Sequence, residues 1–362
     1  MSLSGTSTWL GRPAGDRSGR AIAVGAGLVA LVCAAAILSI ASGPAGFIPG
    51  RALSVMFGMT DTGSPEFARD ALVVVDIRLP RTILAALVGA ALGVSGLVMQ
   101  GLFRNPLADP GIVGVSAGAA MAAVAAIVVG GPWLAALWPP LAVYALPIAA
   151  FAGGLVVTVT LYVIATRDGR TSVATMLLAG IAIGALAGAM TGALVFVSDD
   201  RELRDFTFWS LGSLAGATWE KTTIAAVFLL VVAAFAPGLS RGLDALLLGE
   251  EEARHLGVAI EKLKRRAVFA VAASVGMAVA VAGPIGFVGI VVPHLLRLAI
   301  GPRHAGLLPC CALGGAVLLV AADMAARSVV APAELPVGIV TALIGAPFFL
   351  WLLLRQRALV DL

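Results

Sequence analysis

Long apolar stretches, each near the length needed to cross a bilayer, recur along this 362-residue chain and limit what it can fold into. A transmembrane helix needs about 20 predominantly apolar residues. Hydrophobic residues make up 60% of the chain and charged residues only 12%. A soluble domain of this length would not contain so large a share of apolar residues. In the strands of a membrane β-barrel, apolar and polar residues alternate, and they do not alternate in these stretches. The composition therefore predicts an all-α, polytopic membrane protein.

The polar and Gly/Pro breaks between the apolar stretches predict about ten transmembrane helices. Gly283-Pro284 should divide the long run 267–300 in two, because proline interrupts a helix. The predicted spans are about 21–41, 82–101, 111–130, 141–165, 174–197, 222–237, 267–283, 285–300, 306–326 and 336–354. Together they form a single transmembrane domain over residues 21–357.

The segments outside the spans also carry predictions. Residues 1–20 are rich in Ser, Gly and Arg and predict a disordered tail. The first apolar run could instead be a signal peptide, but its length favours an uncleaved span. Residues 43–80 hold Gly, Pro and mixed charges and predict an external loop.

The distribution of Lys and Arg predicts the orientation. Ten spans put both termini on one side, where we count sixteen Lys and Arg residues against eight on the other. Cytoplasmic loops carry the excess of positive charge, so both termini should be cytoplasmic. If residues 267–300 formed one unbroken span, the chain would have nine spans, and the excess of Lys and Arg on the side of the N-terminus would be smaller.

Residues 78–111 hold the most distinctive pattern in the chain. Arg78 and Arg81 flank a proline, and a polar turn with the sequence QGLFRNPLADPG closes the stretch. Between them, Gly89, Gly93 and Gly96 have helical spacing, which lets helix backbones approach closely in lipid. The spacing alone would suit a helical hairpin of any polytopic protein.

The residues of this stretch resemble a known family. The sequence RLPR, the glycine pattern and the QGLFRNPLADPG turn are similar to the signature of permease subunits of iron-chelate, haem and cobalamin ABC importers. The similarity extends from about Leu72 to Arg355. It implies a type II ABC importer permease fold in a bacterial inner membrane, working as a homodimer with the pathway at the dimer interface, lined by spans five and ten. It also implies two ATP-binding subunits and a periplasmic substrate-binding protein as partners.

The chain itself should not hydrolyse ATP. A phosphate-binding loop needs a Gly-Lys pair within G-x-x-x-x-G-K-[ST]. The three lysines are Lys221, Lys262 and Lys264, and none follows a glycine. ATP should therefore be used by a separate subunit, and the chain is predicted to be a transport subunit rather than an enzyme.

Three arginines are candidates for docking the binding protein. Arg78 and Arg81 lie at the outer end of span two, and Arg327 lies at the outer end of span nine. Their position also suits interfacial anchors. In the resembled importers, the matching arginines receive acidic residues of the binding protein, so the resemblance favours docking.

Residues 240–258 are the candidate coupling segment. Exposed apolar residues beside glutamates, between two glycines, predict a short amphipathic unit laid into a partner's groove, although a charge run can also be a solvated face. In the resembled family the matching segment docks onto the ATP-binding subunit. The residues concerned are Leu248, Gly249, Glu250, Glu252, Ala253, Leu256 and Gly257.

The stretch between spans five and six gives the best indication of the cargo. Arg201 and Arg204 suit two carboxylates, and the aromatic residues Phe206, Phe208 and Trp209 suit a flat ring system. An interfacial aromatic belt is the alternative. The stretch resembles haem permeases more than cobalamin or siderophore permeases, and haem has two propionates on a flat macrocycle. We therefore expect haem as cargo, with a ferric siderophore or cobalamin as the alternative.

Glycines should leave room for that cargo in the pathway. Span five carries Gly184 and Gly188 among a row of glycines, and span ten carries Gly338 and Gly345. The histidines, His255, His294 and His304, all lie at or near the cytoplasmic side of this topology. We therefore expect no axial histidine ligand in the outer half of the path.

The remaining polar residues predict no further chemistry. The three cysteines lack metal-ligand spacing, so we expect no metal site and no permanently bound cofactor. Asp109, Asp323 and Glu334 adjoin apolar runs and should cap helix ends. A channel or a membrane enzyme remains a remote alternative, because neither a filter-like polar repeat nor a nucleophile-base pair is evident.

Overall fold

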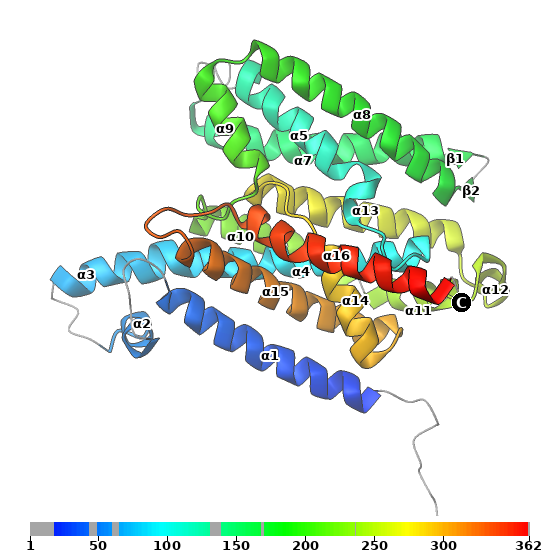
Figure 1. Ribbon diagram of the computed structural model, residues 1–362, viewed down its shortest axis with the longest axis horizontal. Helices are drawn as coiled ribbons and strands as arrows, with labels where there is room; N and C mark the ends of the chain where they lie inside the picture. The colour runs from blue at the N-terminus through cyan, green and yellow to red at the C-terminus, as the bar shows by residue number, and fades with distance from the viewer. Residues whose placement is uncertain are drawn as a thin grey trace, which may run out of the picture.

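A computed structural model describes residues 18–42, 49–59, 65–130, 139–167, 170–235 and 237–360. It is an all-α bundle (Figure 1), as the sequence predicts. The α-helices are α1 (Ser18–Ala41), α2 (Pro49–Met56), α3 (Pro65–Ala71), α4 (Leu79–Phe103), α5 (Val115–Ala125), α7 (Pro139–Ala165), α8 (Val173–Val197), α9 (Asp200–Ser210), α10 (Trp219–Phe235), α11 (Pro237–Leu246), α12 (Glu250–His255), α13 (Ile260–Ala282), α14 (Val288–Ile300), α15 (His304–Ser328) and α16 (Val337–Val360).

Shorter elements complete the described chain. The π-helical turns are η1 (Leu72–Arg78) and η3 (Ala126–Gly130), and η2 (Pro110–Val113) is a 3-10 turn. Strands β1 (Thr166–Arg167) and β2 (Arg170–Thr171) form an antiparallel hairpin between α7 and α8.

An apolar helix occupies each of the ten predicted span positions. Within the described residues, six helical segments are long and apolar enough to cross a membrane, and there are seven if the bent pair α10 and α11 is counted as one span. Three shorter apolar helices cover Val115–Gly130, Val288–Ile300 and Val337–Leu352. The bundle is thus polytopic, and the individual span bounds stay predictions.

The segment before α4 differs from the sequence-based expectation. The external loop predicted for 43–80 is wrong for its described parts, because α2 is helical and α3, η1 and α4 form one helical run, Pro65–Phe103. The apolar residues of η1 extend the helix beyond the N-terminal end of α4, and Trp219 Nε1 donates a hydrogen bond to the Val75 carbonyl at 2.9 Å. Helix α1 begins at Ser18, three residues inside the predicted tail, whose residues 1–17 lie outside the described chain.

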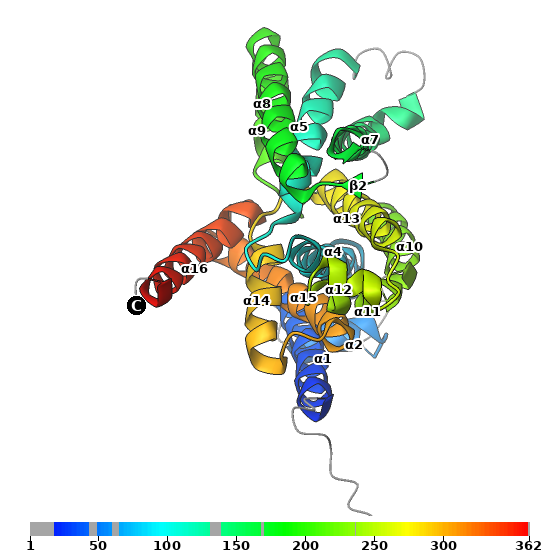
Figure 2. The ribbon, with the colours of Figure 1, turned by 90° about the vertical axis from the view of Figure 1, so that its right-hand side faces the viewer.

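Helix α4 is the centre of the packing. Figure 2 shows it between α13 on one side and α15 and α1 on the other. A side chain at Gly89 would collide with the backbone of Gly315 in α15, and one at Gly96 would collide with the backbone of Gly289 in α14. The close helix approach expected from the glycine spacing is therefore confirmed, and it places α4, α14 and α15 in one tightly packed unit.

Helices α5, α7 and α8 form a second group. In Figure 2 they lie on the far side of α13, together with α9. Helix α13 packs against both α7 and α4 and so joins the two groups. It ends at Ala282, and Gly283 follows with a φ of 70°, a left-handed conformation suited to glycine. The break predicted at Gly283-Pro284 therefore separates α13 from α14.

Candidate functional site

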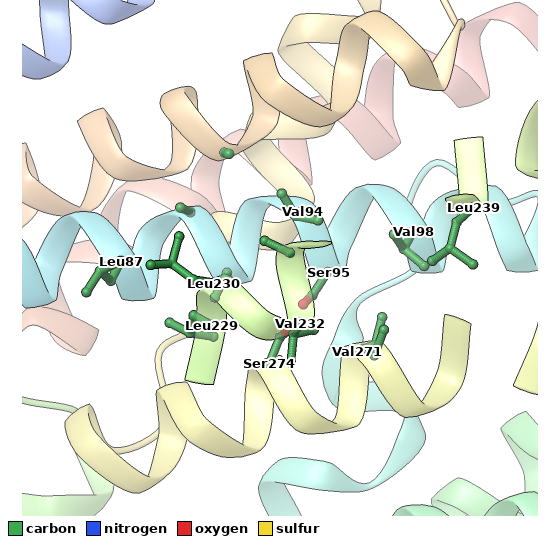
Figure 3. Close-up of a pocket in the computed structure, with 15 residues that line it drawn as sticks. Leu87, Val94, Ser95, Val98, Leu229, Leu230, Val232, Leu239, Val271 and Ser274 are labelled. Carbon is green, nitrogen blue, oxygen red and sulfur yellow. The ribbon is translucent and has the colours of Figure 1, made fainter. Parts of the chain in front are cut away.

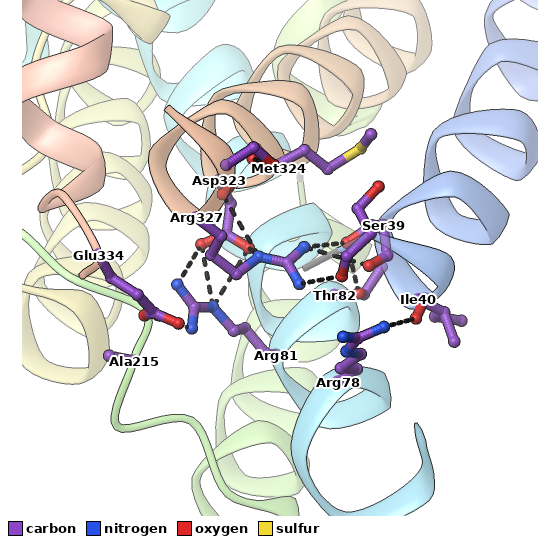
Figure 4. Close-up of polar contacts among 12 residues, drawn as sticks. Ser39, Ile40, Arg78, Arg81, Thr82, Ala215, Asp323, Met324, Arg327 and Glu334 are labelled. Carbon is purple, nitrogen blue, oxygen red and sulfur yellow. Dashed lines mark hydrogen bonds and ion pairs between the residues drawn. The ribbon is translucent and has the colours of Figure 1, made fainter. Parts of the chain in front are cut away.

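The predicted docking arginines lie together, inside the bundle (Figure 4). The Arg81 guanidinium donates to Asp323 Oδ1 through Nε at 3.0 Å and through Nη2 at 2.9 Å. Its Nη1 donates to Glu334 Oε2 at 2.8 Å. Helix α4, helix α15 and the turn before α16 are thereby joined by charge-assisted hydrogen bonds, which are the stronger kind.

The two other arginines tie α1 to the same region. Arg327 Nε lies 3.1 Å from Asp323 Oδ2, and its Nη2 donates to Ser39 Oγ at 2.8 Å. Arg78 Nη1 donates to the Ile40 carbonyl at 2.7 Å. Figure 4 shows these contacts converging on the end of α1.

The burial of these arginines changes how docking has to be understood. Arg78, Arg81 and Arg327 are 5%, 7% and 3% exposed. They are therefore not interfacial anchors whose charged ends lie in water, and they do not present free guanidinium groups to a partner. The docking role stays a prediction, and it requires the buried contacts to be exchanged. We call these three residues with Asp323 and Glu334 the arginine cluster.

The acidic residues divide into two kinds. Asp323 and Glu334 were expected to cap helix ends, and this is wrong, because both are ion-pair partners of Arg81. Asp109 does cap, since its Oδ1 accepts from the Gly111 N–H at 2.7 Å at the start of η2. Burial raises the pKa of the Asp109 carboxyl, and the hydrogen bond from Gly111 opposes that change. The sequence missed the pairing because it involves residues far apart in the chain.

The coupling segment folds into two short helices, α11 and α12, joined by a turn. Gly249 directly precedes α12 and has a φ of 127°. Residues with a side chain rarely adopt such a φ, so the turn between α11 and α12 needs a glycine at this position. Leu248 and Leu256 are 66% and 65% exposed, whereas Ala253 is fully buried. With Leu247, which is also exposed, the segment presents three apolar side chains on the surface, as a docking element would.

The predicted cargo stretch is largely the helix α9. An Asp199 capping box begins it, with Asp199 Oδ1 accepting from the backbone N–H of Glu202 at 2.8 Å. Arg201 and Arg204 are both exposed and lie three residues apart on this helix. No ion pair involves them within the described residues. The same helix also carries three acidic residues, so α9 as a whole is not basic.

The aromatic residues of this stretch follow on the last turns of α9. Phe206 and Trp209 are stacked, with ring centroids 6.3 Å apart and planes at 29°. Phe208 is 61% exposed. The structure thus brings an exposed arginine pair and a stacked aromatic pair onto one short helix at the end of α8.

The glycines expected to line the pathway have opposite surroundings in α8 and α16. A side chain at Gly184 or Gly188 would meet nothing within 4 Å, so this face of α8 is open. A side chain at Gly338 would collide with the Leu211 carbonyl, and one at Gly345 would collide with Phe287. The expectation that the α16 glycines leave room for cargo is therefore wrong, since they permit close packing within the protomer.

An apolar cavity of about 170 Å³ lies between α4, α10, α11 and α13 (Figure 3). Leu87 and Val98 of α4, Leu229 of α10 and Val271 of α13 line it. Ser95 and Ser274 are its polar lining residues, and no lining residue is charged. The cavity therefore has no cationic group that could pair with the carboxylates of haem.

The histidines contribute no ligand cluster in the part of the chain that is described, and no group of three His, Cys, Asp or Glu residues there could hold a metal ion. His304 is fully buried at the start of α15, and its Nδ1 lies 2.7 Å from Asp244 Oδ1. This contact fastens α15 to α11.

Comparisons with known proteins agree with this architecture. The sequence model of the FecCD transport family matches residues 30–355. The hemin transport system permease protein HmuU of Yersinia pestis is 50% identical over 282 residues, which are 78% of this chain and 83% of the relative.

Two relatives carry another cargo in their names. The cobalamin import system permease protein BtuC of Halobacterium salinarum is 46% identical over 313 residues, 86% of this chain and 81% of the relative. The vitamin B12 import system permease protein BtuC of Salmonella typhi is 41% identical over 326 residues, 90% and 93% of the two chains. A solved metal-chelate type ABC transporter in an inward-facing conformation has a TM-score of 0.79 and 32% identity, and the match covers 92% of this chain and 99% of that chain.

Proposed function

This chain belongs to the FecCD transport family, and we propose that its cargo is haem. It is the permease subunit of an ABC importer and not an enzyme. Such a permease is a multi-pass membrane protein that works with ATP-hydrolysing and substrate-binding partners. We place it in a bacterial inner membrane with both termini cytoplasmic, as the distribution of Lys and Arg indicates.

The identity of 50% with a hemin permease is the observation that carries the haem assignment. The exposed Arg201 and Arg204 add support, because guanidinium groups bind carboxylates and haem has two propionates. Phe206, Phe208 and Trp209 offer aromatic surface for a flat macrocycle. Cobalamin is the second candidate, since relatives with 46% and 41% identity are cobalamin permeases.

We propose a homodimer in which the open face of α8 lines the pathway. Gly184 and Gly188 lie on that face without neighbours, which leaves space for cargo or for a second copy. One transmembrane domain over residues 21–357 would hold each half of the path, and the segment 240–258 would contact one of two ATP-binding subunits.

The cargo assignment is tested by transport into proteoliposomes. The permease, its ATP-binding subunit and the cognate binding protein are reconstituted, and uptake of haem, cobalamin and a ferric siderophore is measured with and without ATP. ATP-dependent uptake of haem alone is the expected result. Uptake of cobalamin or the siderophore in place of haem would overturn the cargo and leave the importer assignment intact.

We also propose that the substrate-binding protein docks at the arginine cluster, which requires an exchange of ion-pair partners. The binding protein's carboxylates must take over contacts that Asp323 and Glu334 now make. Glu334 is the accessible competitor, because its side chain is 36% exposed while that of Asp323 is 1% exposed.

Replacing Glu334 with Gln tests this exchange. The substitution frees Arg81 Nη1 from a carboxylate, so the affinity of the binding protein should rise at low salt and the rise should shrink at high salt. Glu66→Gln, at an exposed glutamate of α3, is the control and should change affinity less. An unchanged or lower affinity for Glu334→Gln would show that the cluster only stabilises the fold.

A further inference from the structure

A buried lysine lies beneath the coupling helix α12 and joins three elements. Lys264, near the start of α13, is 3% exposed. Its Nζ lies 2.8 Å from Glu250 Oε1 in α12 and donates to the Thr171 carbonyl of β2 at 2.8 Å. Glu261 Oε1 lies 3.7 Å away on α13 itself. A buried ammonium group is costly unless such partners stay in place, so these contacts hold the elements together.

One side of this junction leads to α8. The Thr171 N–H donates to Glu261 Oε2 at 3.0 Å, so both backbone polar groups of Thr171 are bound to residues of α13. Helix α8 begins two residues later, where Ser172 Oγ accepts from the Thr175 N–H. With so short a connection, a shift of the hairpin end must move the start of α8.

The other side of the junction leads to the surface that a partner would contact. Glu250 begins α12, and the buried Ala253 packs the same helix onto the bundle. Leu248 and Leu256 remain exposed on either side. Force applied at these leucines therefore reaches α13 and the hairpin through the Glu250–Lys264 pair.

We propose that Lys264 is a positioning residue that passes displacement of α12 on to the pathway helix α8. The inference rests on the proposed function, in which the ATP-binding subunit contacts α12. Lys264 touches neither ATP nor cargo, and it acts by making α12, the start of α13 and the hairpin move as one body.

Glu250→Gln is the decisive variant, because it weakens only the contact to α12 and leaves those to Thr171 and Glu261. In proteoliposomes holding the full importer, transport per ATP hydrolysed should fall about five-fold or more, because Gln still accepts a hydrogen bond from Lys264 but no longer carries the opposite charge. Basal ATP hydrolysis and the yield of assembled complex are measured in parallel, because Glu250 belongs to the proposed contact with the ATP-binding subunit and the buried Lys264 does not. Glu251→Gln, one residue further along and exposed, is the matched control and should couple normally.

Lys264→Met and Lys264→Arg extend the test, with the exposed Lys262→Met as control on the same helix. Lys264→Arg should recover coupling that Lys264→Met loses. The double variant of Glu250→Gln and Lys264→Met should be no worse than Lys264→Met alone, since both act on one contact. If Lys264→Met does not fold, Glu250→Gln carries the test.

A distance measurement reports the motion directly. Spin labels are placed at Arg254→Cys in α12 and Ala174→Cys in α8, in a chain with the exposed Cys33 replaced by Ser, and this chain is mixed with an excess of unlabelled chain so that one protomer of a dimer is labelled. The labels should give one narrow distance with and without ATP. The distance should change or broaden on ATP binding in Glu250→Gln. A distance that changes on ATP binding in the otherwise unaltered chain would overturn the proposal.

The variant Leu256→Asp distinguishes two hypotheses: that the ATP-binding subunit contacts α12, and that Lys264 transmits the displacement of α12. If Leu256→Asp uncouples the importer and Glu250→Gln does not, the role of Lys264 is wrong and the coupling segment stands. If both variants couple normally, α12 is not the contact of the ATP-binding subunit and both inferences fall.

Discussion

Helices α4 and α8 have the same length and similar glycine spacing, but opposite surroundings. Each contains 25 residues. In the helical run that contains α4, 72% of an 18-residue apolar stretch is buried. In α8 the corresponding share is 17%. In α4, Gly89, Gly93 and Gly96 face the backbones of α14 and α15. In α8, Gly184, Gly188 and Gly192 face open space.

The comparison shows that a glycine row has no meaning by itself. In lipid, small residues promote close helix packing only where another helix is present. In α4 that helix belongs to the same protomer. In α8 the open face has to be covered by lipid, by cargo or by a second copy, so the same pattern marks a fixed core in one case and an available surface in the other.

The largest effect on stability should come from the arginine cluster that fastens α4 to α15. Replacing Asp323 with Ala leaves Arg81 and Arg327 buried without their shared carboxylate. Breaking a buried ion pair in this way costs about 3–5 kcal/mol. Thermal unfolding in detergent should show a large loss, and Glu251→Ala, at an exposed carboxylate, should show almost none. Similar melting temperatures for the two variants would contradict the cluster's structural role.

A smaller loss is expected from Gly96→Ala in α4. The added methyl group meets the Gly289 backbone, which cannot rotate away as a side chain could. Overpacking of this kind costs about 1–3 kcal/mol. The same unfolding measurement tests it, and an unchanged or higher melting temperature would mean that α4 and α14 are not in close contact.

The matched change in α8 should have the opposite sign. Gly184→Ala meets nothing within the protomer, and alanine favours a helix interior over glycine by roughly 0.5–1 kcal/mol. The protomer should therefore be equally or slightly more stable. A loss as large as that of Gly96→Ala would remove the distinction between the two helices.

The smallest effect on stability should come from Arg204→Ala on α9, within about 0.5 kcal/mol, because its side chain is exposed. Its effect should instead appear in haem uptake, which should fall about ten-fold if one hydrogen bond to a propionate is lost in the limiting step. A haem ester without free propionates should be transported alike by both forms. Equal slowing of haem and ester would assign Arg204 a supporting role only.

The sequence alone determined the helices and their polytopic arrangement. In lipid, the backbone N–H and C=O groups of an apolar run have no water to bond with and must form hydrogen bonds within the run. A long apolar run therefore folds as a helix. Breaks such as Gly283-Pro284 are equally local. The loop predicted before α4 is wrong because the apolar residues of η1, although interrupted by Asp76 and Arg78, continue the helix.

Only the tertiary structure decided the partners of the charged and small residues. Arg81 and Asp323 are 242 positions apart, and local spacing along the chain holds no information on which carboxylate an arginine will meet. The sequence placed the arginines of the cluster at the outer helix ends but left them exposed, whereas packing of α1, α4 and α15 buries them. Lys264 was one cation among several in a charged stretch, and its contacts with Glu250 and Thr171 arise only when α12, α13 and the hairpin meet. How the helices pack decides which distant residues meet. The tertiary structure therefore determines which residues form the sites.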